Sequence, residues 1–339
     1  MNLIDFDEDK QMDIIPLGRA AVDFNANELY RPLEETKTFS KYVGGSPANI
    51  AIGLARLNKN VGFIGRVADD QLGNYVIQYF ENEGIDTSKM PIDDSGAKTG
   101  LTFTEIKSKT ESSILMYRNQ AVDLELCNND IDEDYIKQAK ILLISGTALS
   151  KSPSREAAFL AMKYARNNGV KVIFDIDYRP YSWRNEEETS VYYYHAAEMS
   201  DIIIGSRSEF NYMQRLDHTE DASDEVVANT WLDKNSELVV IKHGADGSTA
   251  YTENGEHYDI KIFPVELMKS FGGGDAYASA FIYGLLEDWD LIEALEFGSA
   301  SASMLVSAHS CSEAMPTAEE IKSFIKEKKE EYGEMVARK

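Results

Sequence analysis

From residue 131 onwards, short apolar segments alternate with longer segments of helical spacing, and few folds accommodate that pattern. The apolar segments, which predict strands buried on both faces, are residues 141–145, 170–176, 201–205 and 238–242. The segments that predict helices are residues 153–168, 186–199 and 223–234. Buried strands joined by helices indicate an α/β fold in which a mostly parallel central sheet is covered by helices on both faces.

The first half of the chain adds a different pattern. Residues 100–106 and 113–118 alternate between apolar and polar side chains around a polar tip, which predicts a β-hairpin. Residues 24–43 are rich in strand-forming residues and have no helical period. We therefore expect a small β-sheet lid, made of residues 24–43 and 99–118. The α/β core then comprises residues 12–23, 44–98 and 119–331, and residues 1–11 and 332–339 are expected to be terminal tails.

Three glycines, Gly272, Gly273 and Gly274, lead directly into Asp275 and into a segment of helical spacing. Glycines allow a ligand to approach the main chain closely, and the first N–H groups of a helix have no partner within it. Such a turn favours an anion. A carboxylate at this place would repel phosphate unless a hydroxyl that must lose a proton lay between them. Asp275 is therefore either a general base or an ordinary helix cap.

A second glycine turn, Gly44-Gly45, leads into another segment of helical spacing. Ser46 is a plausible N-cap for this helix, with a proline after it, and Asn49 would lie one turn in. Asp23 closely follows the first expected strand, at residues 12–17. Since the carboxyl ends of strands in open α/β sheets face the ligand crevice, Asp23 is a candidate ligand-binding residue. The alternative is that Asp23 is simply a turn residue.

Charged side chains and glycines follow several of the later strands. The residues concerned are Arg179, Glu209, Lys242, Gly244 and Gly247. Loops after parallel strands gather at one edge of the sheet, so these groups are expected near the glycine turn that precedes Asp275. A proton acceptor, an anion cradle and cations are the parts that phosphoryl transfer requires. Arg118, at the end of the hairpin, could add a cation or could be an ordinary surface arginine.

Two common nucleotide-binding motifs are missing from the sequence. It contains no Gly-x-x-x-x-Gly-Lys-Ser/Thr loop, which excludes a P-loop enzyme. It also has no strand followed by Gly-x-Gly-x-x-Gly, which argues against a nicotinamide-dependent enzyme. Phosphoryl transfer by another type of kinase is therefore the leading hypothesis.

The charge balance excludes several classes of partner. The formal net charge of −24 argues against binding to nucleic acid or to an anionic membrane surface, both of which need a basic face. The two cysteines do not form a metal-like pair, and no disulfide framework is indicated. Without a signal peptide or an apolar run long enough to cross a bilayer, a reduced cytoplasmic setting is expected.

Both glycine turns resemble signatures of the ribokinase-like (PfkB-type) carbohydrate kinases, and the likeness extends over nearly the whole chain. Gly44-Gly45 followed by Asn49 resembles the first signature, and Gly272-Gly273-Gly274-Asp275 resembles the second. The resemblance implies a ribokinase-like fold in which Asp275 is the catalytic base and the amides of Gly272 to Gly274 hold the transferring phosphoryl group.

The same resemblance implies roles for the other candidates. Sugar hydroxyls would be bound by Asp23, Gly44, Gly45 and Asn49. ATP would be bound by Lys242, Gly244, Gly247, Gly272 and Gly274. Glu209 would help to organise Mg²⁺, indirectly through water. The resemblance further implies a homodimer that associates through the lids.

Within this family, the likeness is strongest to kinases that phosphorylate the terminal hydroxyl of a sugar acid in myo-inositol breakdown. Three stretches carry it, residues 40–49, 145–148 and 177–183. A carboxylate on the substrate would suit the arginine forks of Arg118 and Arg179, and related ketodeoxygluconate kinases have arginines at both motif positions. The alternatives are a kinase for 2-keto-3-deoxygluconate or fructose, and a catalytically idle sugar-binding regulator on the same scaffold.

Three residues depart from the family pattern. Ser206 replaces the asparagine of the Asn-x-x-Glu motif, and Asp177 replaces the asparagine of Asp-x-Asn-x-Arg. Lys269 lies six residues before Asp275, where many relatives have an aspartate that helps to bind potassium. The hypothesis for this chain is that the Lys269 ammonium takes over part of the electrostatic role of that ion.

Overall fold

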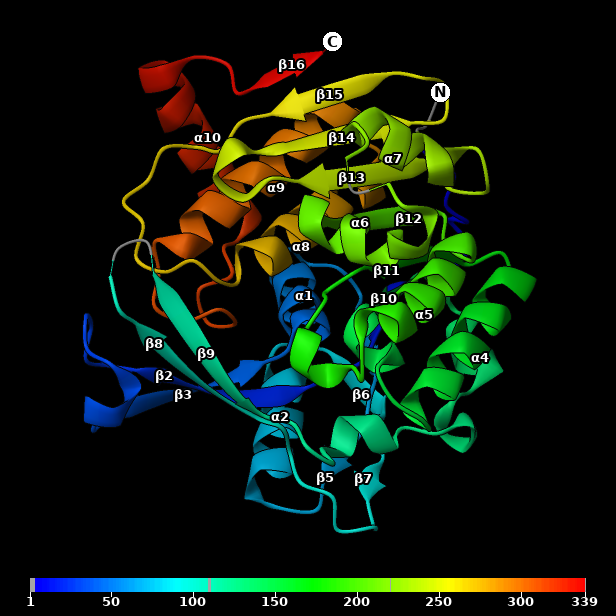
Figure 1. Cartoon of the computed structure of the whole chain (residues 1–339), viewed down its shortest axis with the longest axis vertical. Coiled ribbons are helices and arrows are strands. Elements are labelled where there is room, and N and C mark those ends of the chain that lie inside the picture. Colours follow the sequence, from blue (N-terminus) through cyan, green and yellow to red (C-terminus); the bar gives the residue numbers. More distant parts are fainter. Residues whose placement is uncertain (1–3, 109–110, 220, 339) are drawn as a thin grey trace.

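The computed structural model describes residues 4–108, 111–219 and 221–338. Its main sheet contains β1 (Met12–Leu17), β4 (Gly62–Ile64), β6 (Asp86–Lys89), β10 (Ala139–Ser145), β11 (Lys171–Asp175), β12 (Ile202–Ser206), β13 (Leu238–Lys242), β14 (Ser248–Thr252), β15 (His257–Ile260) and β16 (Val336–Arg338). The strands are ordered β16-β15-β14-β13-β12-β11-β10-β1-β4-β6 (Figure 1). Strands β6 to β13 in this order pair in parallel, whereas β14, β15 and β16 add an antiparallel edge.

Helices cover both faces of this sheet, as predicted. One face is covered by α1 (Ser46–Arg56), α2 (Gln71–Asn82), α8 (Gly273–Leu286), α9 (Leu291–Val306) and α10 (Ala318–Tyr332). The other is covered by α3 (Glu133–Ile136), α4 (Ser154–Asn167), α5 (Glu186–Glu198), α6 (Arg207–Met213) and α7 (Asp224–Leu232). Alternate residues of one strand enter different cores: Ile141 and Leu143 of β10 pack on the first face, Leu142 on the second. Burial on both sides explains why these strands are apolar throughout.

A second, four-stranded sheet stands beside the core, which confirms the predicted small sheet (Figure 1). Its strands, in spatial order, are β3 (Phe39–Gly44), β2 (Ala21–Ala26), β8 (Leu101–Ile106) and β9 (Ser112–Tyr117). Strands β8 and β9 form the expected hairpin, and β2 pairs in parallel with β8. Because β2 begins at Ala21, Asp23 lies on this small sheet and not at the end of β1. A short pair of strands, β5 (Val67–Ala68) and β7 (Ile92–Asp93), forms a third sheet.

Both ends of the described chain are more ordered than the expected tails. Ile4 is buried in the first core, and Lys10 donates a 2.8 Å hydrogen bond to the carbonyl oxygen of Lys137. At the other end, residues 336–338 form β16, which pairs antiparallel with β15, so the end of the described chain is not simply a tail. The three residues of β16 are too few to show the alternation that is typical of a strand. Pairing through backbone hydrogen bonds leaves no pattern in the side chains either. In the described part of the chain, no helix combines the length and apolar character needed to cross a bilayer.

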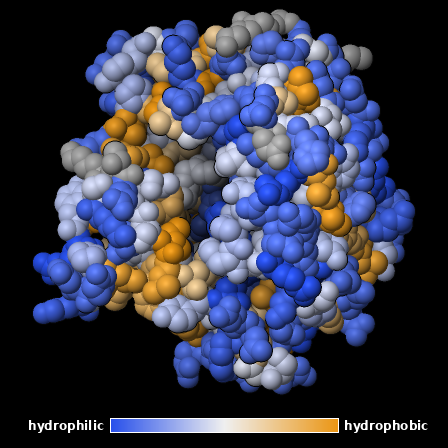
Figure 2. Space-filling model, in the orientation of Figure 1, coloured by the Kyte–Doolittle hydropathy of each residue, from blue (hydrophilic) through white to orange (hydrophobic). Residues whose placement is uncertain are grey.

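A hollow opens over the N-terminal end of α8 (Figure 2). The small sheet lies on one side of it and the loops after the core strands lie on the other. Apolar side chains gather along the small-sheet side, and Ile114, Leu115 and Tyr117 of β9 are among the exposed large side chains. The fold therefore places both glycine turns and the strand-end loops around one cleft.

Candidate active site

Asp275 lies in the first turn of α8, directly after the three glycines. The helix begins at Gly273, with Gly272 in the N-cap position at a φ of 85°. Oδ2 of Asp275 accepts a 2.7 Å hydrogen bond from Nδ2 of Asn49, which lies in the first turn of α1. Burial raises the pKa of Asp275, repulsion by Asp177 raises it further, and the hydrogen bond from Asn49 lowers it. A side chain of α1 thus holds the carboxyl group in place at the N-terminal end of α8.

The glycine loop has no room for side chains on its inner side. A Cβ atom at Gly272 would lie 2.5 Å from Sγ of Cys311, and one at Gly273 would lie 2.9 Å from Cγ1 of Val306. A Cβ atom at Gly274 would lie 3.4 Å from Nζ of Lys242, at the end of β13. The loop therefore packs closely against Cys311 and Val306 on its inner side. It also brings the first N–H groups of α8 next to a lysine ammonium. That combination suits a phosphate group.

A cavity of about 550 Å³ extends from this loop and contains all five residues predicted to bind the nucleotide. These are Lys242, Gly244, Gly247, Gly272 and Gly274. Its remaining walls are largely apolar, formed in part by Ile262, Val265, Leu267 and Val306. An apolar slot that ends in a lysine and free amides can accept a flat base at one end and phosphates at the other.

The four residues predicted to bind the sugar also lie together. A Cβ atom at Gly44 would lie 2.1 Å from Oδ1 of Asp23, so glycine is needed there for the Asp23 carboxylate to occupy its place. Gly45 has a φ of 103° and packs against the main chain of Arg19. Burial raises the pKa of Asp23, and repulsion by Asp275 adds to the increase. The two carboxylates therefore face the same cleft.

The start of α1 differs in one detail from the prediction. The helix begins at Ser46 with Gly45 in the N-cap position, so Ser46 is not the cap. Its hydroxyl instead donates a 2.8 Å hydrogen bond to Oδ2 of Asp175, at the end of β11. The serine was a reasonable cap candidate from its position before a proline, but a carboxylate from a distant strand competes for its hydroxyl.

Several carboxylates crowd the strand ends beside the glycine loop. Burial raises the pKa of Asp175 to about 7, and repulsion by Asp177 and Glu209 contributes, while Lys242 opposes the change. Glu209 accepts hydrogen bonds from the backbone N–H groups of Tyr178 and Ser206, at 2.9 and 2.7 Å. Within the described ranges, no three His, Cys, Asp or Glu side chains are arranged to hold a metal ion by themselves. A divalent cation would therefore need oxygen ligands from a substrate as well.

The two predicted arginines, Arg118 and Arg179, differ in their burial and in the partners that they already have. Arg118 is buried in an ion pair with Asp123 and also donates hydrogen bonds to the carbonyl oxygen of Thr147 and to Ser182 Oγ, at 3.0 and 3.1 Å. Arg179 forms a 2.7 Å ion pair with Asp177, but its side chain is 35% exposed. Arg179 can therefore reach the cleft, whereas Arg118 ties the end of the hairpin to the core.

The segment after α9 connects the small sheet to the glycine loop. Nδ2 of Asn25, on β2, donates a 2.9 Å hydrogen bond to the carbonyl oxygen of His309. Two residues further on, Cys311 packs behind Gly272. The fully buried Lys269 donates a hydrogen bond to the carbonyl oxygen of Ser310, and its Nζ lies 3.3 Å from Cys311 Sγ. Lys269 thus lies behind the anion cradle and not in the cleft.

A profile of the pfkB family carbohydrate kinases matches residues 12–318. The chain belongs to the pfkB family of carbohydrate kinases. It is 62% identical, over the full length of both chains, to 5-dehydro-2-deoxygluconokinase of Clostridium tetani. The crystal structure of a PfkB protein from Polaromonas sp. JS666 is 28% identical, with a TM-score of 0.80 over 92% of this chain and 99% of that one. A fructokinase with bound ATP from Xylella fastidiosa is 25% identical, with a TM-score of 0.82 over 93% and 98%.

Membership of the pfkB family confirms the predicted ribokinase-like fold and the predicted class of phosphotransferase. Kinases of this family act on carbohydrates. The roles of the individual site residues remain predictions, which the geometry supports to different degrees. Arg19, which packs against Gly45, was not predicted as a site residue, although it lies in the turn after a strand like the other candidates.

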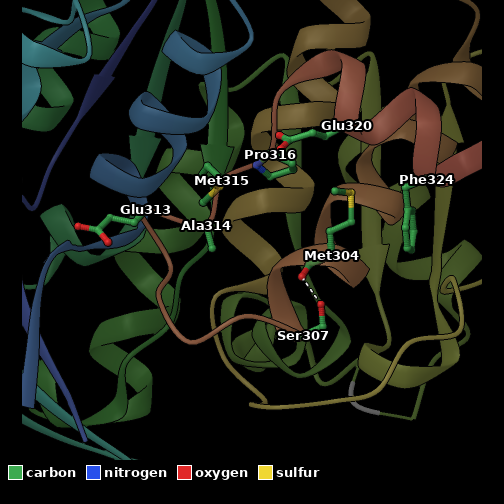
Figure 3. A pocket seen from close by; sticks show the side chains of 8 residues that line it. All are labelled: Met304, Ser307, Glu313, Ala314, Met315, Pro316, Glu320 and Phe324. Carbon is green, nitrogen blue, oxygen red and sulfur yellow. Dashed lines mark hydrogen bonds between the residues drawn. The ribbon is translucent and has the colours of Figure 1, made fainter. Parts of the chain in front are cut away.

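This pfkB-family chain also has a second cavity, of about 370 Å³, apart from the predicted site residues. It lies where α9 ends and α10 begins, and it is lined by Met304, Ser307, Glu313, Ala314, Met315, Pro316, Glu320 and Phe324 (Figure 3). Ser307 Oγ donates a 2.7 Å hydrogen bond to the carbonyl oxygen of Met304 within it. Its lining includes no cation, so it offers nothing for a phosphate.

Proposed function

We propose that this kinase transfers the γ-phosphoryl group of ATP to the terminal (C6) hydroxyl of 5-dehydro-2-deoxy-D-gluconate, in myo-inositol breakdown. The observation that carries the proposal is the position of Asp275, held by Asn49 at the mouth of a glycine cradle in a cleft beside a nucleotide-sized cavity. The full-length likeness to the Clostridium tetani enzyme supports the choice of substrate. The likeness to an ATP-bound fructokinase supports ATP as the donor.

In this mechanism, Asp275 accepts the proton of the sugar hydroxyl. The hydroxyl oxygen forms a bond to the γ-phosphorus while the bond from that phosphorus to the β-bridging oxygen breaks, and ADP leaves. In a loose transition state the attacking hydroxyl loses its proton late, so a carboxylate is a strong enough base. The hydrogen bond from Asn49 aims the carboxylate and stabilises its ionised form.

The phosphoryl group would be held by the amides of Gly272 to Gly274 and by the ammonium of Lys242. These groups are fixed before the reaction, so they stabilise the developing charge without reorganising. Mg²⁺, when bound with ATP, would neutralise phosphate charge, and Glu209 and Asp175 would hold it through water. Burial is the main cause of the raised pKa of Asp175, and repulsion by Asp177 and Glu209 adds to it. A bound cation would relieve that repulsion, so the carboxylates present fit the ion.

The sugar acid would lie between the small sheet and the core. Asp23, Asn49 and the main chain of Gly44 and Gly45 would bind its hydroxyls. Arg179 would lie near the sugar acid, and Arg118 would act indirectly, through its contact with Ser182. Closure of the small sheet as a lid would exclude water, which otherwise competes with the sugar for the phosphoryl group.

A substrate panel with coupled detection of ADP tests this function. The sugar acid of myo-inositol breakdown should be turned over much faster than 2-keto-3-deoxygluconate, and both faster than fructose. Equal rates with neutral hexoses would indicate that the substrate is a neutral sugar such as fructose and not the sugar acid. Binding of sugar acids without any ADP formation would indicate a regulator instead of an enzyme.

We also propose that two copies associate through their small sheets and work in the cytoplasm. The exposed apolar residues Ile114 and Leu115 lie on β9, which is an edge strand of the small sheet and could contact a second copy. Both cysteines, Cys127 and Cys311, are free, which suits a reducing compartment. A monomeric mass at all concentrations in light scattering would contradict the dimer.

A further inference from the structure

Arg19 is a buried arginine that forms no close ion pair with an acidic side chain in the described part of the chain. It lies in the turn between β1 and β2, and only 4% of it is exposed. Its Nη1 atom lies 3.0 Å from Sδ of Met116, a weak acceptor, and its Nε atom has no hydrogen-bond partner. Among the described residues, no carboxylate lies within 4.0 Å of its guanidinium.

The other nearby cations already have an acidic partner or a proposed ligand. Arg118 is paired with Asp123, and Arg179 is paired with Asp177. Lys242 lies beside Gly274, in the cavity proposed for the nucleotide. Burying an unpaired charge is costly, and a ligand that pairs with it recovers that cost. Arg19 is therefore the cation that is best placed to meet an anionic group of the sugar.

The position of Arg19 puts it on the sugar side of the cleft. Its Cγ atom would lie 3.5 Å from a Cβ atom at Gly45, so its side chain runs along the sugar-binding turn. The hydroxyl of Tyr181, from the loop after β11, lies 3.0 Å from the same Met116 sulfur. The charge of Arg19 also acts on Asp23, whose pKa it lowers against the effect of burial. Arg19 thus lies where the small sheet, the glycine turn and that loop meet.

We propose that Arg19 binds the carboxylate of the sugar acid and so sets the preference of the enzyme for acids over neutral sugars. This assignment rests on the proposed function. The reacting hydroxyl and the carboxylate are at opposite ends of the six-carbon substrate, so with the hydroxyl at Asp275 the carboxylate needs a separate cation. The cleft already contains Asp23, Asp175 and Asp275, which repel an anion unless an arginine fork compensates.

The competing explanation is that Arg19 only supports Asp23 and fills space beside Met116. The two roles differ in what a substitution changes. Loss of a support would lower turnover of every sugar in the same proportion. Loss of a carboxylate-binding group would raise KM for the acid selectively, because a neutral analogue never uses it.

The experiment compares Arg19→Gln and Arg19→Lys with Arg184→Gln, a matched control at an exposed arginine. The kinetics use the sugar acid and its analogue with a hydroxymethyl group in place of the carboxylate. For Arg19→Gln, kcat/KM for the acid should fall about 10- to 100-fold, while that for the neutral analogue and KM for ATP stay within about twofold. Arg19→Lys should recover part of the loss, since it keeps the charge without the fork. Thermal unfolding checks that both variants fold, and calorimetry of sugar-acid binding without ATP gives an independent readout.

The outcomes separate this assignment from the proposed function. A wild-type enzyme with no preference for the acid would overturn both. If the wild type prefers the acid and Arg19→Gln retains the full preference, the function stands and the assignment to Arg19 is wrong. An equal loss with the acid and with the neutral analogue would assign Arg19 a supporting role instead.

Discussion

The side-chain amide of Asn49 donates a 2.7 Å hydrogen bond to the carboxylate of Asp275, and it thereby joins the first turn of α1 to the first turn of α8. The two glycine turns lie far apart in the sequence, yet each ends beside the same carboxylate. In the proposed function, one turn would bind the sugar and the other would bind the phosphoryl group. The hydrogen bond would then hold the proposed base at the point where the two substrates meet.

Replacing Asn49 by leucine should shift the pH dependence of the reaction. The hydrogen bond from Asn49 lowers the pKa of Asp275, whereas burial raises it. Without the bond, the pKa rises further, so the ionised base is lost at a higher pH as the solution is acidified. The acidic limb of kcat/KM should move upward by roughly one pH unit. An unchanged limb, in a variant with normal thermal stability, would show that this bond does not act on the base.

Replacing Gly272 by alanine should impair both stability and activity. The new Cβ atom would lie 2.5 Å from Cys311 Sγ, and the φ of 85° is unfavourable for alanine. We expect a loss of about 1–3 kcal/mol in the free energy of unfolding and little remaining turnover. Gly84→Ala is the matched control, because Gly84 has a φ of 77° but a Cβ atom there meets nothing within 4 Å.

Gly84→Ala should lower the free energy of unfolding by about 1 kcal/mol, through the unfavourable backbone conformation alone, and should leave turnover unchanged. Urea unfolding and steady-state kinetics measure both effects. If the two alanine variants behaved alike, close packing behind the glycine loop would not matter for catalysis.

Asp175 should make the protein less stable as the pH rises through the range from about 4 to about 7. Burial raises the pKa of this carboxyl to about 7, from an ordinary value of 3.8 in the unfolded chain. The folded state then binds more protons than the unfolded state across this range, so raising the pH favours unfolding. Asp175→Asn should remove this contribution, which amounts to a few kcal/mol at most.

The measurement for Asp175 is the free energy of unfolding of both proteins in urea across that pH range. The curve of the variant should lie increasingly above that of the wild type as the pH rises. Asparagine can still accept the hydrogen bond from Ser46, so folding should not be disturbed. Parallel curves would mean that Asp175 ionises normally.

The kinase should work without added potassium. The Lys269 ammonium lies behind the anion cradle, bonded to the carbonyl oxygen of Ser310 and 3.3 Å from Cys311 Sγ. A cation built into the chain makes a bound monovalent ion unnecessary at that place. Turnover in tetramethylammonium buffer should match turnover in potassium buffer. A manyfold increase on adding potassium would reject this role for Lys269.

Much of the fold could be predicted because its signals are local. The strands at residues 141–145 and 238–242 are apolar on both faces, and glycines or capping residues end the helices between them. The antiparallel edge strands β14 to β16 were not predicted. They are short, and their pairing depends on backbone hydrogen bonds between distant segments.

The candidate site was predictable to the extent that glycines reveal close packing. Gly44 and Gly272 have no room for a side chain, and the sequence marks such positions directly. The sequence does not show which carboxylate neutralises which arginine. Asp123 lies only five residues after Arg118, but its pairing with that arginine depends on how the hairpin meets the core. For the same reason, only the three-dimensional structure shows that Arg19 forms no close ion pair among the described residues.

The most direct test of the account is single-turnover phosphoryl transfer by Asp275→Asn, measured with the sugar acid and ATP. Removing the base while keeping the shape should slow transfer by about 10²-fold or more, with both substrates bound nearly as tightly as in the wild type. Transfer at a rate within a fewfold of the wild type would contradict the claim that Asp275 takes the proton.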